Sequence, residues 1–346
     1  MDDFSPAQAL LIDRRVTLPS FLQIEPVGQC NLQCRMCPVM FREDAPSNGG
    51  PAFMPFENFV GILDQFPHLR ELHLQGLGEP MMHPQFFDMV AYATARGVTV
   101  STNSNLTLLS ESRAERCITS GLSALHISFD GATPDTYEDI RVGARFERVA
   151  ENIQKVCRAK TQFGSTCPLL RLVVVIMRRN LEELPELIRL AHRWSISSVF
   201  VQHLSQDLGE SAVPHSYGVM QAFIQQETLL GADPEQVDRY FEAARLMALE
   251  LAIELRLPWL GPRRSPRAVG RHACDWPWNG AYVTYQGYAI PCCMIATPDR
   301  LHMGNMVKHG VQQVWNGDRY QMFREQMDSD NPPVICRSCS VYNGNF

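Results

Sequence analysis

The sequence predicts an α/β protein in which a partial (β/α)6, TIM-like barrel is followed by a small cysteine-rich domain. Two observations lead to this prediction. Short apolar runs alternate with segments of helical periodicity between residues 21 and 204, and cysteines gather near both ends of the chain. Strands that alternate with helices are typical of a parallel sheet with right-handed crossovers. A doubly wound open sheet is the alternative that this pattern leaves open.

The predicted strands and helices follow one another in a regular order. The strands are short runs rich in Val, Ile and Leu, whereas the helices place apolar residues three or four positions apart. The strands are 21–25, 71–75, 98–102, 124–129, 170–177 and 198–204. The helices between them are 56–66, 85–96, 110–120, 145–160 and 181–194.

The pattern divides the chain into four parts. A lead-in over residues 1–20 precedes the barrel, which is predicted to span 21–205. Residues 206–270 form a helical connecting segment, with one predicted helix over 234–255 and a linker rich in Pro and Arg. Residues 271–346 are dense in Cys, Gly, Pro and Trp. Because so short a segment buries little apolar surface, we expect bound metal to stabilise it.

Composition limits the classes of function. The chain has 346 residues and a net charge of −6, which disfavours nucleic acid as a partner because such binding needs clustered Lys and Arg. The sequence contains no apolar stretch of membrane-spanning length, and its beginning does not have the basic and apolar regions of a signal peptide. We therefore expect a cytoplasmic protein that binds no membrane. In that compartment the 11 cysteines are expected to serve as metal ligands or reactive groups rather than disulfides.

The first cysteine group follows the first predicted strand directly. Cys30, Cys34 and Cys37 are separated by three and two residues, so one loop can fold their thiolates around one metal centre. Thiolates favour iron–sulfur clusters or zinc. Zinc would need a fourth ligand nearby, and the closest histidines, His68 and His73, belong to another β/α unit. The group therefore predicts a [4Fe–4S] cluster with one open iron. A zinc knuckle or unrelated buried thiols are the alternatives.

This C-x3-C-x2-C sequence resembles the signature of the radical S-adenosylmethionine (SAM) superfamily, and the resemblance covers nearly the whole chain. It implies that SAM binds the open iron and that one electron from the cluster breaks the sulfonium bond. The resulting 5′-deoxyadenosyl radical would take a hydrogen atom from the substrate. A donor of the flavodoxin or ferredoxin type would supply the electron. Met36 matches the family position that packs near the adenine, and a core methionine is the alternative.

The residues after the second strand resemble another family element. Gly78, Glu79 and Pro80 are similar to the end of a Gly-Gly-Glu-Pro sequence that holds the amino group of SAM. Leu77 stands where the family has the first glycine of the pair. A β/α barrel places its active site at the carboxyl ends of its strands, which is where these residues lie. An ordinary turn is the alternative interpretation.

Polar residues also follow the third and fourth strands. Asn103 ends the third strand, and Ser128 and Asp130 end the fourth. The resemblance implies that these residues contact SAM, with Ser128 near its ribose or carboxylate region. It also implies that Arg141 pairs with the methionine carboxylate, which a guanidinium can bind through two hydrogen bonds. The alternatives are a turn at Asp130 and a surface ion pair at Arg141.

The second cysteine group predicts a fully ligated centre. Its members come from separated segments, and zinc is possible from the ligand count alone. The layout C-x12-G-x4-C followed by C-x2-C resembles the auxiliary-cluster modules called SPASM and twitch, which follow the barrel in many radical SAM enzymes. The resemblance implies one auxiliary [4Fe–4S] cluster, because the sequence ends at Phe346, soon after the last cysteine. Cys293 remains an alternative to the second ligand. The predicted ligands are Cys274, Cys292, Cys336 and Cys339.

The two cysteine groups together suggest a reaction class. A cluster with four protein thiolates has no site for substrate, so we expect it to carry electrons. Hydrogen-atom abstraction followed by loss of an electron and a proton is a two-electron oxidation. The truncated module is similar to that of an aminoglycoside-biosynthetic dehydrogenase, and this favours a small polar substrate, such as a sugar or aminocyclitol. No residue is identified as the base. The alternatives are a peptide- or protein-modifying maturase, a redox-neutral epimerase or dehydratase, and an electron carrier.

Overall fold

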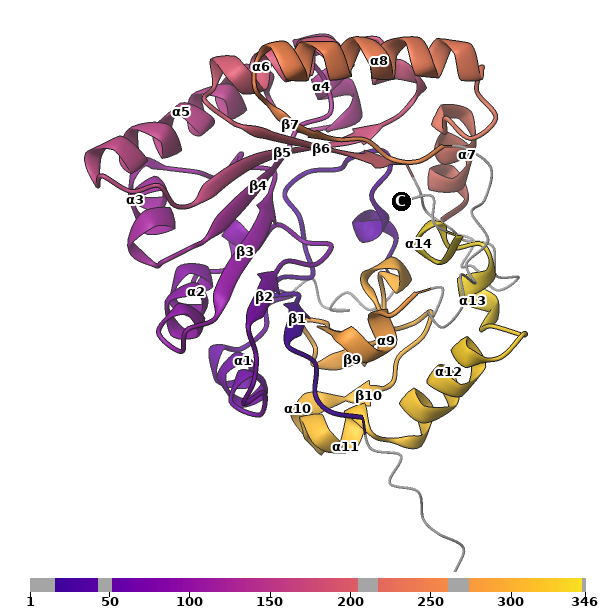
Figure 1. The fold of residues 1–346 in the computed structure, drawn as a ribbon. Coiled ribbons are helices and arrows are strands. Elements are labelled where there is room, and N and C mark those ends of the chain that lie inside the picture. The colour runs from indigo at the N-terminus through magenta and orange to yellow at the C-terminus, as the bar shows by residue number, and fades with distance from the viewer. Residues whose placement is uncertain (1–15, 43–51, 205–216, 261–273, 344–346) are drawn as a thin grey trace, which may run out of the picture.

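The computed structural model describes residues 16–42, 52–204, 217–260 and 274–343. Most of the predicted lead-in and parts of the predicted connecting segment therefore lie outside the described residues. Figure 1 shows one curved sheet with helices along its outer face. The strand order is β10-β9-β8-β1-β2-β3-β4-β5-β6-β7, and the strands from β8 to β7 pair in parallel.

The six predicted strands are all present, and the partial barrel is confirmed. Each strand follows the previous one in space as in sequence, which excludes the doubly wound alternative, in which the strand order reverses. The structure moves the strand ends by one to a few residues. The strands are β1 (Phe21–Ile24), β2 (Glu71–Leu74), β3 (Thr99–Ser104), β4 (Ala124–Ser128), β5 (Leu169–Ile176) and β6 (Ser198–His203).

Helices connect these strands and cover the outside of the sheet (Figure 1). Several begin at side chains that accept a backbone N–H. Ser110 caps α3 by accepting from Arg113 N, and Thr133 caps the unpredicted helix α4 by accepting from Thr136 N. The helices of the barrel are α1 (Phe56–Leu63), α2 (Phe86–Thr94), α3 (Glu111–Thr119), α4 (Pro134–Ile140), α5 (Phe146–Gln162), α6 (Leu184–Arg193), α7 (Gly218–Glu227) and α8 (Pro234–Glu250).

The predicted helix over 234–255 is too long. Helix α8 ends at Glu250, and the chain then turns through Ala252, whose φ is +54°. The next residues form a strand, β7 (Glu254–Arg256), which pairs in parallel with β6. Three residues are too few to show the alternation of a strand in the sequence. The connecting segment thus adds a seventh parallel strand to the barrel.

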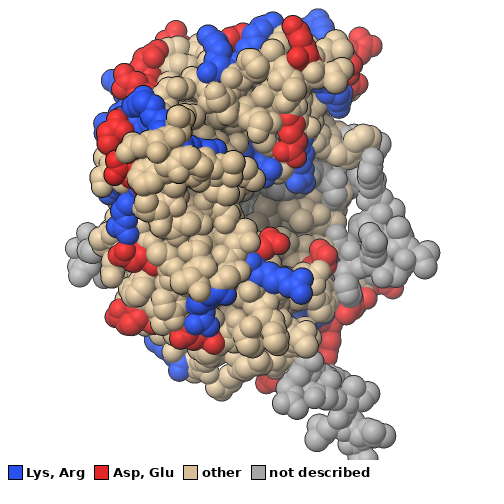
Figure 2. Space-filling model, turned by 60° about the vertical axis from the view of Figure 1, so that its left-hand side comes forward, with Lys and Arg blue, Asp and Glu red and all other residues tan. Residues whose placement is uncertain are grey.

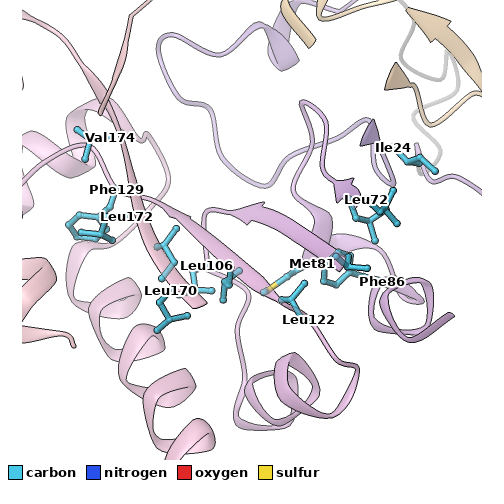
Figure 3. Close-up of a cluster of buried hydrophobic side chains, with 14 of the residues drawn as sticks. Ile24, Leu72, Met81, Phe86, Leu106, Leu122, Phe129, Leu170, Leu172 and Val174 are labelled. Carbon is cyan, nitrogen blue, oxygen red and sulfur yellow. The ribbon is translucent and has the colours of Figure 1, made fainter. Parts of the chain in front are cut away.

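The apolar core lies between the sheet and its outer helices. Side chains alternate along a strand, so one set of residues faces the helices and the next faces the inside of the barrel. Figure 3 shows two strand residues of the outer set, Leu72 and Leu172, together with Phe86 of α2 and Leu122, which precedes β4; all are at most 1% exposed. Many of the residues that alternate with the outer set on the inner face are polar, among them Gln23, His73 and Asn103. This arrangement leaves the inside of the barrel to groups that can bind a polar ligand.

The inner face carries two histidines that burial keeps neutral. His73 on β2 donates from Nε2 to Gln75 Oε1 at 3.0 Å, and its Nδ1 accepts from Ser101 Oγ at 2.8 Å. The ring of His126 on β4 lies 5.8 Å from that of His73. Burial lowers the pKa of His73 to about 4, and burial together with His73 and Arg171 lowers the pKa of His126 to about 4.

We expect these histidines to make the folded state less stable as the pH falls below about 6.5. The unfolded chain then binds protons that the folded chain takes up only near pH 4, and each such proton costs about 1.4 kcal/mol per pH unit. Replacing His126 with Gln should flatten the fall in urea midpoint between pH 7 and pH 5. Replacing the exposed His192 with Gln should leave the fall in urea midpoint unchanged. Equal pH slopes for both variants and the parent would contradict this expectation.

The C-terminal module continues the same sheet rather than standing apart from it. Strand β8 (Gly280–Val283) pairs in parallel with β1, and β9 (Tyr288–Ile290) and β10 (Gly304–Asn305) follow antiparallel. The module is more helical than the sequence suggested, because most of its helices are too short to show periodicity. These helices are α9 (Trp276–Asn279), α10 (Met306–His309), α11 (Val311–Trp315), α12 (Asp318–Asp328), α13 (Val334–Arg337) and α14 (Ser340–Asn343). Over the described ranges, no helix combines the length and the apolar character that crossing a bilayer requires.

Candidate functional site

The three cysteines of the first group line one cavity of about 270 Å³. Cys30, Cys34 and Cys37 lie in the loop after β1, which runs directly into the 3-10 turn η1 (Pro38–Phe41). The rest of the wall comes from the loop after β2, the ends of β3 and β4, the residue that follows α4, and Val175 of β5. The cavity therefore lies at the carboxyl ends of the first strands, where parallel α/β folds place their sites.

The thiols of this group are buried and close enough to influence one another. Burial, with a smaller effect of neighbouring thiols, raises the pKa of Cys30 to about 11 and that of Cys37 to about 12. Burial also raises the pKa of Cys34, while the Arg141 guanidinium opposes this. Such thiols become thiolates only when a metal compensates the charge. The loop is thus suited to a metal centre and poorly suited to a free nucleophile.

Three thiols in one loop suit an iron–sulfur cluster, because each thiolate can bind a different iron and one iron is left open. Two donors face Cys30 Sγ: Leu32 N at 3.4 Å and Asn105 Nδ2 at 3.6 Å. Hydrogen bonds of this kind favour the thiolate form.

Six of the eight residues predicted to contact SAM line the same cavity. They are Met36, Gly78, Glu79, Asn103, Ser128 and Arg141. Pro80 and Asp130 do not line it. Pro80 opens the short turn η2 (Pro80–Met82) and so sets the path of the chain after Glu79. Three further polar residues of the cavity wall were missed by the sequence prediction, although they lie where β2 and β3 end: Gln75, Ser104 and Asn105.

The Glu79 carboxylate is already held by the protein. Its Oε1 accepts from Ser104 Oγ at 2.7 Å and from Met81 N at 3.0 Å, and its Oε2 accepts from Asn105 N at 2.8 Å. Burial raises the pKa of Glu79, and these donors oppose the rise. The carboxylate thereby joins the loop after β2 to the end of β3. Any contact with the SAM amino group would have to share oxygens that these donors already use.

Asp130 acts on the cavity through Arg141. Asp130 is completely buried, its Oδ1 accepts from Val175 N at 2.7 Å, and its Oδ2 lies 2.7 Å from Arg141 Nη2. Burial alone would lower the pKa of Arg141, but Asp130 and the Cys34 thiol raise it. The guanidinium is therefore a permanent charge held in one orientation at the cavity wall, as binding of a carboxylate requires.

Two buried polar atoms at the cavity wall fit a polar ligand. In the described part of the protein, Asn103 Oδ1 and Arg141 Nε are buried and form no hydrogen bond. One is an acceptor and the other a donor, and both residues line the cavity. Because burying a polar atom without a partner costs about 1–3 kcal/mol, a ligand that pairs them is favoured. The amino, carboxylate and hydroxyl groups of SAM supply both kinds of partner.

We expect Arg141→Lys to weaken SAM binding by about tenfold to a hundredfold. Lysine keeps the charge but loses the forked geometry, and hydrogen bonds between charged groups contribute about 1.5–3 kcal/mol. Equilibrium dialysis of SAM on the anaerobically reconstituted protein measures the effect. Arg145→Lys is the matched control, because Arg145 pairs with Glu138 on the surface with 78% of its side chain exposed. The same affinity in both variants would show that Arg141 does not bind SAM.

The second cysteine group lines a separate cavity with an apolar wall. Cys274, Cys292, Cys336 and Cys339 face this space together with Trp276, Pro277, Phe323 and Met327. Cys293 is not part of the wall. Burial raises the pKa of Cys274 to about 11 and that of Cys336 to about 12, and it raises the pKa of Cys292 strongly. The geometry therefore favours Cys292 over Cys293 as the second ligand.

The two cysteine groups lie at opposite ends of the β1–β8 pair. Cys274 precedes β8 and Cys292 follows β9, whose register places Ile290 opposite Tyr282, so both lie near the start of β8. At that end the ring of Trp276 packs edge-on against Phe21 of β1, with centroids 5.6 Å apart. The first group follows the other end of β1. This separation gives each group its own cavity within one continuous sheet.

Comparisons with known proteins match both halves of this arrangement. A model of the radical SAM superfamily matches residues 24–191, and a model of SPASM, an iron–sulfur cluster-binding domain, matches residues 274–340. The chain is 24% identical to the tungsten-containing aldehyde ferredoxin oxidoreductase cofactor-modifying protein of Pyrococcus furiosus, over 93% of this chain and 87% of that protein.

Other relatives are similar over as much of the chain. It is 25% identical to the mycofactocin maturase MftC of Mycobacterium tuberculosis, over 98% of this chain and 81% of the relative. It is also 25% identical to the PqqA peptide cyclase of Gluconobacter oxydans, over 94% of this chain and 84% of that cyclase. Among solved structures, SuiB of Streptococcus suis bound to its precursor peptide SuiA superposes with a TM-score of 0.67 at 17% identity, covering 94% of this chain and 71% of that one.

These findings overturn the predicted small-molecule substrate. The relatives include a peptide cyclase, and a solved structure of the same fold holds a precursor peptide. The sequence prediction was wrong because it took the substrate class from the spacing of the second cysteine group. That spacing determines how the cluster is held, and no residue of that group contributes to the cavity of Cys30, Cys34 and Cys37.

Proposed function

The chain is an enzyme of the radical SAM superfamily with a SPASM iron–sulfur module, and on that basis we propose that it modifies a peptide or protein substrate. Its radical SAM domain binds a [4Fe–4S] cluster and SAM, and its SPASM domain binds auxiliary iron–sulfur. The observation that carries the proposal is the likeness to a peptide cyclase over 94% of the chain, which includes both cysteine groups.

The proposal assigns roles to the residues of both cavities. Cys30, Cys34 and Cys37 hold the cluster that binds SAM, and Arg141, oriented by Asp130, holds the SAM carboxylate. Asn103 and Ser128 bind further polar groups of SAM. The cluster and SAM together supply a 5′-deoxyadenosyl radical that removes a hydrogen atom from the substrate. Gly78 and Glu79 shape the loop after β2. Glu79 ties this loop to the end of β3 through Ser104 and Asn105. Gly78 permits close packing, because a Cβ there would collide with the carbonyl oxygens of Val27 and Gln29.

The second cysteine group is proposed to hold an auxiliary [4Fe–4S] cluster that accepts an electron from the substrate radical. Cys274, Cys292, Cys336 and Cys339 occupy all of its corners, so no position is left for a substrate atom. Its apolar surroundings keep water away, which tunes the reduction potential of such a cluster. The outcome for the peptide is then an oxidation, with the auxiliary cluster as the first acceptor of the electron.

The surface gives little reason to expect a strongly charged substrate. Figure 2 shows a hollow on one face, with Lys and Arg interspersed with Asp and Glu around it. Arg35, which lies between two cysteines of the first group, is paired with Asp139 at 2.7 Å, and Asp139 also pairs with Arg179. Charges of both signs thus neutralise one another near the cluster loop. We expect recognition through main-chain hydrogen bonds and apolar contacts.

The proposal is tested with peptides encoded beside the gene. The reconstituted protein is incubated anaerobically with SAM, dithionite and each peptide, and both 5′-deoxyadenosine and peptide mass are followed. We expect one peptide to stimulate 5′-deoxyadenosine formation and to change in mass, with deuterium at the modified carbon passing into 5′-deoxyadenosine. Failure of every encoded peptide, together with stimulation by a sugar or aminocyclitol, would refute the proposal.

A second candidate is modification of a metal cofactor or its precursor. It is favoured by the likeness to the cofactor-modifying protein of Pyrococcus furiosus, which extends over 93% of this chain. The same assay distinguishes the two, because a cofactor precursor rather than a peptide would then stimulate 5′-deoxyadenosine formation and change in mass.

A further inference from the structure

One buried carboxylate joins three segments that are far apart in the sequence. Glu25 follows β1, and its side chain is 0% exposed. Its Oε1 accepts from Arg42 Nη1 at 2.8 Å and from Leu77 N at 3.0 Å. Its Oε2 accepts from Arg42 Nη2 at 3.3 Å and from Tyr285 N at 3.3 Å. Both oxygens are therefore shared between the barrel and the C-terminal module.

Each of these partners belongs to a functional part of the molecule. Arg42 ends the segment that carries the three cysteines of the first group, and its side chain is 1% exposed. Leu77 belongs to the loop after β2 that lines the SAM cavity. Tyr285 lies in the turn between β8 and β9, in the module that carries the second group. The carboxylate is thus a common support for the cluster loop, the SAM loop and the module.

The packing around Glu25 leaves little room for these segments to move independently. A Cβ on Gly76 would collide with the Glu25 side chain, and a Cβ on Gly28 would collide with the Tyr285 ring. The Arg42 guanidinium lies over that ring, 5.2 Å from its centroid, and Arg42 Nη1 also reaches Gly28 O at 3.3 Å. A shift of the β8–β9 turn would therefore be transmitted to both walls of the cavity.

We propose that Glu25 is a positioning residue that makes SAM binding depend on the docking of the C-terminal module. Ion pairs and hydrogen bonds are strong in the interior and fix one arrangement of the groups that they join. Without the charge of Glu25, Arg42 would lose this buried ion pair, and the loop at Leu77 would lose its link to Tyr285. This inference concerns SAM affinity alone, so it stands or falls independently of the peptide substrate.

The first test compares Glu25→Gln with Glu227→Gln in the full-length, reconstituted protein. Glu227 is a matched control, because its side chain is 7% exposed and pairs with Arg179 at 2.7 Å, and the hydrogen bonds of its carboxylate within the described residues are all to Arg179. For Glu25→Gln we expect the dissociation constant of SAM to rise by about tenfold, as for the loss of one charged hydrogen bond, with the iron content unchanged. Hydrogen exchange should rise in residues 76–79 and 284–287 together. Glu227→Gln should show neither change.

A second pair of variants decides the matter if Glu25→Gln does not fold. Gly28→Ala pushes against the Tyr285 ring while leaving the ion pair intact, and we expect it to weaken SAM binding. Adding Tyr285→Ala removes the obstacle and should restore most of the lost affinity. A purely local disturbance at Gly28 would not be rescued in this way. Unchanged SAM affinity in Glu25→Gln, or absence of rescue at Gly28, would overturn the proposal.

Discussion

Replacing Cys30, Cys34 and Cys37 with alanine is expected to abolish the formation of 5′-deoxyadenosine. The three thiols line the SAM cavity, and each is proposed to bind a different iron, so their loss leaves no cluster to deliver the electron. Iron should fall to about half, because one of two four-iron clusters remains. Both quantities are measured on the anaerobically reconstituted protein, by chromatography of the nucleoside and by iron analysis.

The matched control replaces three cysteines that lie elsewhere in the barrel. Cys117 is buried in the core, Cys157 is partly buried and donates to Trp194 O at 3.4 Å, and Cys167 is exposed. The triple alanine variant at these positions should keep its full iron content and its SAM cleavage. If the Cys30, Cys34 and Cys37 variant still cleaved SAM, the assignment of the first cavity would be wrong.

Replacing Cys336 and Cys339 with alanine is expected to separate SAM cleavage from product formation. The second cavity shares no wall with the first, so 5′-deoxyadenosine should still form. The auxiliary cluster would be lost, however, and with it the electron acceptor that the proposed oxidation needs. We expect about half of the iron to remain, and modification of the peptide substrate to cease.

Two further observations make this prediction decisive. Metal binding is coupled to folding, so the variant should also unfold at a lower temperature, and circular dichroism at the assay temperature must show that it remains folded. Cys293→Ala is the companion variant, because Cys293 follows a proposed ligand but does not line the cavity. It should retain both clusters. Product formation that survives the loss of Cys336 and Cys339 would exclude the role of electron acceptor.

The sequence predicted most of the fold because the relevant signals lie in contiguous residues. Short apolar runs marked the six strands between Phe21 and His203, and helical spacing marked the longer helices between them. Shorter elements gave no such signal. Helix α4 (Pro134–Ile140) covers only two turns, and β7 (Glu254–Arg256) only three residues. Both were missed, although β7 extends the sheet and α4 leads directly into Arg141.

The candidate site was predictable to the extent that its chemistry is local. The spacing of Cys30, Cys34 and Cys37 within one loop already indicates a shared centre. The positions after the strands also pointed to the cavity, since parallel strands bring their carboxyl ends together. The sequence did not predict which of these side chains face the cavity, because that depends on tertiary contacts. Asp130 proved to face Arg141 instead of the cavity, and Asn105 proved to face Cys30.

By itself, the sequence determined the class of chemistry, since ligand type and spacing within a loop are properties of neighbouring residues. Only the tertiary structure decided how the two cavities are held together. The proposal of Cys292 rather than Cys293 as a ligand rests on the tertiary observation that Cys292 lines the second cavity. The meeting of Glu25 with Tyr285 joins residues 260 positions apart. Contacts of this range arise from the pairing of β1 with β8 and the burial that follows, and no local pattern of residues encodes them.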